Sequence, residues 1–430
     1  MPEQSRPARP AYDDLMPRTL PALFLLALSP LSAQITAFTH ATLIDGSGRP
    51  PFSDTTLMVE AGRILAIAPS SSLKPPAGAR IVDATGRTII PGIINLHAHI
   101  DADTPVKLRQ FALYGVTSVV GMGGDGDEVL KIRAAQRSGP LGGDIKGARV
   151  YTVQQRFEFE KDAPSAAIAR SRVDDLAHKG VDAVKLVVDN RHNTQPKLSP
   201  EIQFAIIDQA HKHHLKAFAH MYDLADAKFL VEHGIDLLAH NVRDTDVDDA
   251  LIAAMKKHGT PLTATLTGSL SYFTYADNPA FVRDPYFLKF ADPVRVQQAL
   301  NIFPAKQKTD PVATQNRADY AISSKNLRRL AAAGVKIAFG NDDGNNPTRF
   351  EGYFEHLEAE HMVTQAGMTP MQVITAFSKT NSEVLGIDKN YGTLAKGKVA
   401  DFLLLVRSPE NDILNTRSIE AVYLGGRKFE

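Results

Sequence analysis

The amino-acid sequence predicts an α/β fold: a (β/α)8 TIM barrel with a small β-sandwich domain built from both ends of the chain. Three observations support this prediction. Short strand-like segments recur through the middle of the chain, helix-like stretches separate most of them, and short alternating segments precede and follow this region. Eight strands that alternate with helices fit a closed parallel barrel better than an open sheet.

The composition narrows the classes of partner. The 430 residues include 48 basic and 48 acidic side chains, so the formal net charge is zero. This balance argues against nucleic acid as the main partner and favours a small-molecule substrate. Cysteine is absent, so any metal ion must be held by His, Asp, Glu or a lysine-derived group. The sequence leaves open whether the chain forms a homo-oligomer.

Residues 1–34 are interpreted as a leader. From Met16 the chain carries one arginine, then an apolar run over Leu20–Leu28, then small residues up to Ala33. This order resembles a secretory signal peptide over about Met16–Ala33, and the run is too short for a stable membrane span. We therefore expect a periplasmic or secreted protein.

Two β-rich stretches flank the predicted barrel. Residues 35–90 contain "FTHATLIDG" and "ARIVDATGRTIIPG", and residues 389–430 contain "GTLAKGKVADFLLL" and "AVYLGGRKF". Glycine and proline between short alternating segments are typical of antiparallel strands. We assign both stretches to one β-sandwich domain, with the barrel, residues 91–388, inserted between them.

The barrel strands are predicted from apolar runs bounded by turn residues. Ser199 is the expected N-cap of the helix "PEIQFAIIDQAHKHH", and "LADAKFLVEHG" ends on a glycine, as helices commonly do. The strands are expected at Ile93–His97, Thr117–Met122, Ala148–Val153, Ala183–Val188, Lys216–His220, Leu237–Asn241, Pro261–Leu266 and Val335–Asp342.

One connection interrupts this alternation. Residues 267–313, between strand seven and the helix that leads to strand eight, are rich in aromatic residues from Tyr272 to Phe303. Long loops in compact domains are usually functional. Two interpretations remain open: a helical hairpin with its own small core, and a lid or pocket wall for an apolar substrate.

Ionisable side chains lie at or near the ends of the predicted strands. Barrels of this type carry their chemistry at the C-terminal ends of the strands. Two histidines one residue apart on a strand point to the same side, and a lysine inside an apolar strand is costly to bury as a cation. The expected metal ligands are His97, His99, Lys185, His220, His240 and Asp342.

Lys185 allows three interpretations. It can be a Schiff-base lysine with a lowered pKa, a lysine paired with a carboxylate, or a lysine carboxylated by carbon dioxide that bridges two metal ions. The neighbouring histidines favour the third, with two divalent ions, zinc being the expected one. Two such ions about 3.5–4 Å apart would turn a bridging water into hydroxide near neutral pH. Asp342 would orient that hydroxide and carry its proton to the leaving group.

The chain resembles the amidohydrolase superfamily over nearly its whole length after the leader. "PGIINLHAH" resembles the strand-one signature, "AGVKIAFGNDDG" that of strand eight, and "GTLAKGKVADFLLL" the return into the β domain. Asn341 stands where the resemblance leads us to expect threonine or serine. In the binuclear branch with a carboxylated lysine, the resemblance implies that one ion is bound by His97, His99, Lys185 and Asp342, and the more exposed ion by Lys185, His220 and His240.

Within the superfamily, "AFAHMYDLADAKFLVEHGIDLLAHN" is similar to prolidase-like dipeptidases, carboxypeptidase-like amidohydrolases and ochratoxinase-like amidases. The resemblance implies that Tyr222 is a catalytic residue that contacts the substrate carboxylate or carbonyl. Many of the dipeptidases have a glycine-rich segment ending in histidine where this chain reads "VYTVQQRFEFEK". Arg156 in this segment is the candidate to bind a substrate carboxylate through a bidentate pair.

The expected reaction is hydrolysis of the amide bond in N-acyl amino acids or dipeptide-like compounds. The alternatives are hydrolysis of a lactone or cyclic amide at the same site, as in imidazolonepropionase-like enzymes, and a non-catalytic binding protein. Arg156, Arg243 and Arg349 can each be ordinary surface residues, and this is the favoured interpretation for all three. Asp343 is a weaker candidate than Asp342 for the aspartate at the metal site, because only one of two neighbouring residues can point inward.

Overall fold

A computed structural model describes residues 34–430 except 101–102, 140–145, 193 and 345. Gln34–Glu430 form one compact unit. The predicted signal peptide lies outside the described residues. Among the helices that are described, none is long and apolar enough to cross a membrane.

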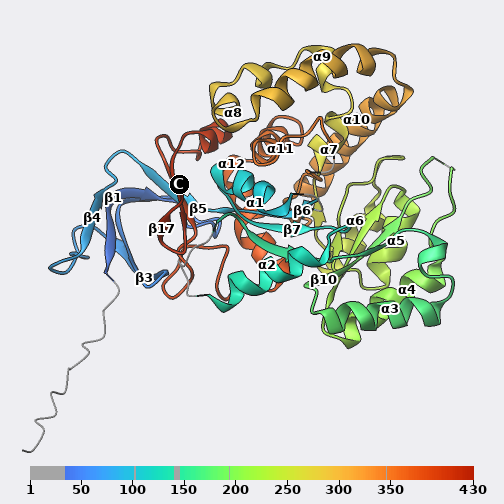
Figure 1. The fold of residues 1–430 in the computed structure, drawn as a ribbon, viewed down its shortest axis with the longest axis horizontal. Helices are drawn as coiled ribbons and strands as arrows, with labels where there is room; N and C mark the ends of the chain where they lie inside the picture. Colours follow the sequence, from blue (N-terminus) through green and yellow to red (C-terminus); the bar gives the residue numbers. More distant parts are fainter. Residues whose placement is uncertain (1–33, 101–102, 140–145, 193, 345) are drawn as a thin grey trace, which may run out of the picture. The chain divides into compact units, whose positions relative to one another are not determined.

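Strands from both ends of the chain form one sheet (Figure 1). The order is β17-β16-β15-β5-β1-β2-β3, with β4 paired to β1. β15 pairs antiparallel with β5, which joins the C-terminal stretch to the N-terminal one. The strands are β1 Thr36–Leu43, β2 Phe52–Glu60, β3 Arg63–Pro69, β4 Arg80–Asp83, β5 Thr88–Pro91, β15 Phe402–Leu405, β16 Ile419–Leu424 and β17 Arg427–Lys428.

This sheet curves around its own apolar core. Phe38 on β1 and Phe402 on β15 have β5 between their strands, so a flat sheet would hold them about 10 Å apart. Their ring centroids lie only 5.0 Å apart, and Tyr423 stacks on Phe402 at 4.6 Å. The three rings belong to one buried apolar cluster that strands from both ends of the chain build together.

The barrel consists of two parallel sheets joined at their edges. Leu96 N donates to Phe339 O at 3.1 Å, and Asp182 N donates to Thr152 O at 2.9 Å. One sheet contains β6 Ile93–Ala98, β7 Val116–Gly121 and β8 Arg149–Thr152. The other contains β9 Arg156–Phe157, β10 Ala183–Val188, β11 Lys216–Met221, β12 Leu237–Leu238, β13 Leu262–Thr263 and β14 Ile337–Ala338. Every expected barrel strand overlaps one of these.

Helices follow most of the barrel strands. Ser199 caps α4 as expected, its hydroxyl accepting from Ile202 N, and left-handed glycines end α3 and α6. The helices are α1 Thr104–Leu113, α2 Asp127–Ser138, α3 Ala166–Lys179, α4 Pro200–Lys212, α5 Leu224–Glu232, α6 Asp249–His258, α10 Pro311–Ala332, α11 Tyr353–Thr364, α12 Pro370–Thr375 and α13 Asn381–Leu385.

The aromatic segment before β14 folds into a helical subdomain with its own core. It contains α7 Leu266–Leu270, α8 Pro285–Phe290 and α9 Pro293–Thr309, and it continues into α10 (Figure 1). Phe281 and Phe287 are buried and pack on Tyr353 of α11 with ring centroids 5.9 and 5.0 Å away. These rings pack in the core of the subdomain, as the helical-hairpin interpretation expects, and Phe281 also lines a cavity together with Tyr353. Tyr272, which is 37% exposed, is the exception.

Gly340 allows the chain after β14 to lie against β6. A Cβ atom at Gly340 would come within 2.8 Å of His97 Cβ and 3.0 Å of His97 N. We expect Gly340→Ala to lower the free energy of unfolding by about 2 kcal/mol, because a backbone cannot yield as a flexible side chain can. Urea unfolding measures this change. Gly126→Ala is the matched control, since nothing lies within 4 Å of its Cβ position, and an equal loss in both variants would contradict the argument.

Candidate metal centre

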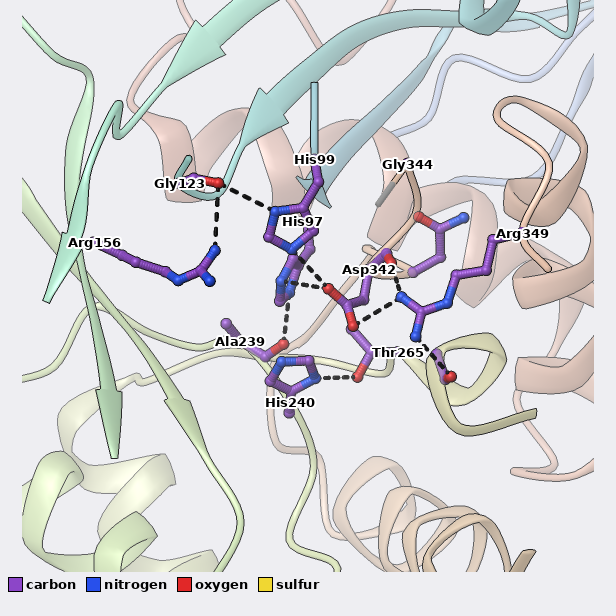
Figure 2. A network of polar contacts seen from close by, with 12 residues as sticks. His97, His99, Gly123, Arg156, Ala239, His240, Thr265, Asp342, Gly344 and Arg349 are labelled. Atoms are coloured by element: carbon purple, nitrogen blue, oxygen red, sulfur yellow. Dashed lines mark hydrogen bonds and ion pairs between the residues drawn. The ribbon is translucent and has the colours of Figure 1, made fainter. Parts of the chain in front are cut away.

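Three side chains from distant parts of the chain converge inside the barrel (Figure 2). His97 is the penultimate residue of β6, His240 follows β12, and Asp342 follows β14. One potential ligand atom of each lies within 4.8 Å of the others. The His97 and His240 rings are 4.7 Å apart, and His99 lies 5.8 Å from His97. The strand ends therefore bring together the residue types that a divalent ion binds.

Asp342 is the aspartate that faces the histidines. Its Oδ1 lies 3.0 Å from His99 Nε2 and 3.2 Å from His97 Nε2. Its backbone is in the left-handed region at φ 60°, where a non-glycine residue is strained, and its N donates to His97 O at 2.9 Å. Asp343 is also buried, but burial and Glu351 raise its pKa to about 8. The structure thus separates the two neighbouring aspartates as the sequence predicts.

The tautomer of His97 leaves the lone pair of its Nε2 available to a metal ion. Its Nδ1 lies 2.8 Å from the Ala239 carbonyl, which can only accept, so Nδ1 carries the proton. Burial, reinforced by Lys185, lowers the pKa of His97 to about 4, so the ring is neutral near pH 7. The lone pair on Nε2 then faces the Asp342 carboxylate. Two electron-rich atoms in contact are stable when a cation lies with them, which fits a metal ion at this position.

His220 and His240 form a second pair. Their ring centroids are 4.2 Å apart. His220 Nε2 donates to Asp189 Oδ2 at 2.8 Å, which leaves Nδ1 as a free ligand atom, and His240 Nδ1 lies 3.0 Å from Thr265 Oγ1. Burial lowers the pKa of His220 to about 3 and that of His240 well below its usual value. Asp189 orients the His220 ring in the way that carboxylates do around metal-bound histidines, and the sequence analysis missed it.

Lys185 is buried in the same interior. It lies within β10, is 2% exposed, and its Nζ has no hydrogen-bond partner among the described residues. Burial lowers its pKa to about 7, against an opposing effect of Asp342, while Arg156 adds to the lowering. The interpretation that Lys185 is paired with a carboxylate is supported by no hydrogen bond among the described residues. A buried amine that has no hydrogen-bond partner in the described chain, and that lies near enough to His97 to lower its pKa, fits a group that the lysine would share with metal ions.

Arg349 was expected at the surface, and this expectation is wrong. It is 2% exposed, its Nη1 lies 2.9 Å from Asp342 Oδ2, and its Nε donates to Ser271 Oγ at 2.9 Å. Burial raises the pKa of Asp342, but the Arg349 guanidinium is the largest of the opposing effects that hold this pKa well below its usual range. Arg349 thus keeps Asp342 ionised and fixes its orientation.

Tyr222 and Arg156 lie near the cluster, each with a partner of its own. The Tyr222 hydroxyl donates to Asp319 on α10 at 2.8 Å. Arg156 Nε donates to Glu158 at 2.8 Å, and its Nη1 lies 3.5 Å from the Gly123 carbonyl, which also contacts His99 (Figure 2). The structure places both beside the site, with the polar atoms assigned to substrate already engaged by the protein.

The stability of the metal-free protein should depend on Lys185. In the folded chain Lys185 is neutral above about pH 7, whereas its ordinary value is 10.5, so folding releases a proton between these values. The free energy of unfolding should therefore rise with pH in this window, by up to about 1.4 kcal/mol per pH unit for one proton. Urea unfolding at about pH 7.5 and at about pH 9.5 measures this rise. Lys185→Met should lack this contribution, and an identical pH dependence in both proteins would contradict it.

A barrel whose strand ends gather histidines and an aspartate defines a candidate metalloenzyme. Residues 88–428 match the model of the amidohydrolase family. The chain belongs to the amidohydrolase family.

Comparisons with individual proteins agree with this assignment. An uncharacterized protein of Mycobacterium tuberculosis is 28% identical over 256 residues, which cover 54% of this chain and 63% of the mycobacterial one. The chain thus spans under two thirds of that relative's length. Among solved structures, a candidate prolidase from Bifidobacterium longum has a TM-score of 0.77 and 23% identity, covering 92% of this chain and 95% of its own. Ochratoxinase from A. niger has a TM-score of 0.71 and 17% identity, covering 93% and 96%. Both show the shared fold.

Proposed function

We propose that this chain is a metal-dependent hydrolase that cleaves the amide bond of N-acyl amino acids or dipeptide-like compounds with a free carboxylate. The observation that carries the proposal is the convergence of His97, His240 and Asp342 within 4.8 Å, together with a buried Lys185 amine that has no hydrogen-bond partner in the described chain. The similarity to a prolidase-type protein and to an ochratoxinase supports an amide bond as the target.

The donor set fits two divalent ions, with zinc as the expected metal. Neutral imidazoles and a carboxylate are the ligands that zinc prefers. The lowered pKa leaves part of Lys185 as free amine near neutral pH, and this amine can add to carbon dioxide, lose a proton and become a carboxylate. Ions bound there would acidify a water molecule and polarise the substrate carbonyl. The proposed ligands are His97, His99, carboxylated Lys185, His220, His240 and Asp342.

The chain's own residues would position and move the proton. Asp342 is ionised because Arg349 contacts its Oδ2, and its Oδ1 faces the histidines. Asp342 would take a proton from the attacking water and return it to the nitrogen of the leaving group, as a general base and then a general acid. Asp189 would hold the His220 ring in one orientation through the 2.8 Å hydrogen bond.

Tyr272 supports an apolar group in the substrate. Its ring is 37% exposed and its centroid lies 5.6 Å from the Arg349 guanidinium, next to Asp342. The other aromatic rings of this segment that the sequence analysis invoked are largely packed in the subdomain core. The expected apolar contact therefore reduces to this ring.

Export is part of the proposal and has its own test. The order of one arginine, an apolar run and small residues supports a signal peptide cleaved close to Gln34. N-terminal sequencing of protein purified after secretion should start near Gln34, and a retained leader would contradict export by this route.

A substrate panel tests the reaction. Zinc-loaded protein is assayed with N-acyl amino acids, dipeptides, lactones and cyclic amides, and we expect turnover of the first two classes. Cleavage of lactones or cyclic amides alone would support the second reaction instead. Tight binding of an amide without any turnover, unchanged in Asp342→Asn, would indicate a binding protein.

A further inference from the structure

Arg243 lies at the C-terminal end of the barrel strands, three residues after His240. Its backbone N donates to the Tyr222 carbonyl at 3.0 Å, which ties the loop after β12 to the loop after β11. Its Nη2 donates to the Met221 carbonyl at 3.2 Å. The guanidinium therefore lies next to the residue that follows His220, one of the proposed ligands of the more exposed ion.

Among the described residues, Arg243 differs from the other arginines around the site in having no carboxylate partner. Arg156 and Arg191 both contact Glu158, at 2.8 and 3.0 Å, and Arg349 contacts Asp342. For Arg243, the described chain supplies one hydrogen bond from Nη2 to the Met221 carbonyl, at 3.2 Å, and its buried Nε has no partner. A half-buried cation without a counter-charge is costly unless an anion from outside completes it.

The surroundings hold this guanidinium in place. Its Cζ lies 5.1 Å from the centroid of the Tyr222 ring. The Tyr222 hydroxyl is fixed by Asp319, and the His192 ring packs edge-on against Tyr222 at 5.0 Å. A guanidinium group that is already ordered loses little rotamer freedom when it binds a planar anion such as a carboxylate.

We propose that Arg243 is the specificity residue that binds the carboxylate of the substrate, with Tyr222 as the residue that positions it. This inference rests on the proposed function and replaces the substrate contacts that the sequence assigned to Tyr222 and Arg156. A guanidinium can bind a carboxylate through two parallel hydrogen bonds. It lies beside the proposed ligands of the more exposed ion, so a carboxylate on it would place the adjacent amide bond near the site.

The test compares a substrate acid with its neutral analogue. N-acetylphenylalanine and its carboxamide are titrated calorimetrically into the zinc-loaded wild type, Arg243→Gln and Arg243→Lys, and hydrolysis of both is followed in parallel. Arg317→Gln is the matched control, because Arg317 also stacks on an aromatic ring, Phe273, at 4.4 Å but is paired with Asp277.

We expect Arg243→Gln to weaken binding of the acid about a hundredfold and to change binding of the carboxamide by less than about threefold. Arg243→Lys should bind the acid more tightly than Arg243→Gln does, because lysine keeps the positive charge but lacks the two parallel N–H donors of a guanidinium. Equal weakening for acid and carboxamide, or no weakening, would overturn the inference while leaving amide hydrolysis intact. Binding of the acid that depends on Arg243, without hydrolysis of either compound, would sustain the inference and contradict the proposed function.

Discussion

Asp342→Asn should lower kcat on the best amide substrate by about 10³-fold or more while the protein stays folded. The substitution keeps the size of the side chain but removes the base that accepts and returns the proton, a role worth 10²–10⁴ in rate in general. It also leaves the buried Arg349 without its counter-charge, so we expect a loss of about 1–3 kcal/mol in the free energy of unfolding. Steady-state kinetics, metal analysis and urea unfolding measure the three effects.

Asp343→Asn is the control for this prediction. Burial and Glu351 raise the pKa of Asp343 to about 8, so this side chain is largely protonated near pH 7 and asparagine is a close replacement. We expect turnover within a few-fold of the wild type. Equal losses in the two variants, or full activity in Asp342→Asn, would contradict the role given to Asp342.

Lys185→Met should remove turnover and make the metal-free protein more stable. The methionine side chain fills similar space without an ionisable group. In the wild type, folding at pH 7.5 removes a proton from Lys185 and this costs free energy, whereas methionine has no such proton to lose. We expect the metal content to fall from two ions to at most one per chain, and the free energy of unfolding of the metal-free protein at pH 7.5 to rise by about 1–3 kcal/mol. Metal analysis and urea unfolding measure both.

The opposite signs of these two effects make the result specific. If Lys185 had a purely structural role, its substitution would lower the free energy of unfolding of the protein and leave the metal content unchanged. Retained activity together with two bound ions would contradict the assignment of Lys185 as a bridging ligand.

The barrel strands and the cluster's residues were predictable because both follow from local patterns. β10 coincides with the expected Ala183–Val188, since a buried parallel strand is a continuous apolar run between turn residues. His97, His240 and Asp342 converge because the C-terminal ends of parallel barrel strands meet at one face. The short β12, Leu237–Leu238, shows the limit: pairing with neighbouring strands, rather than the apolar run itself, decides where hydrogen bonding stops.

The residues around the cluster were not predictable in the same way. Arg349 follows β14 in a loop whose path brings it back to Asp342 and to Ser271 in the inserted subdomain. Asp189 reaches His220 across two adjacent barrel strands. Each contact depends on loop conformation and on packing between segments far apart in sequence, which no short-range pattern encodes.

The measurement that tests the central claim most directly is the metal content per chain of the purified protein, together with its intact mass under non-denaturing conditions. The account predicts two divalent ions per chain and the added mass of one carbon dioxide, both absent from Lys185→Met. One ion with no added mass would contradict it, because Lys185 would then not be the shared ligand of a binuclear centre.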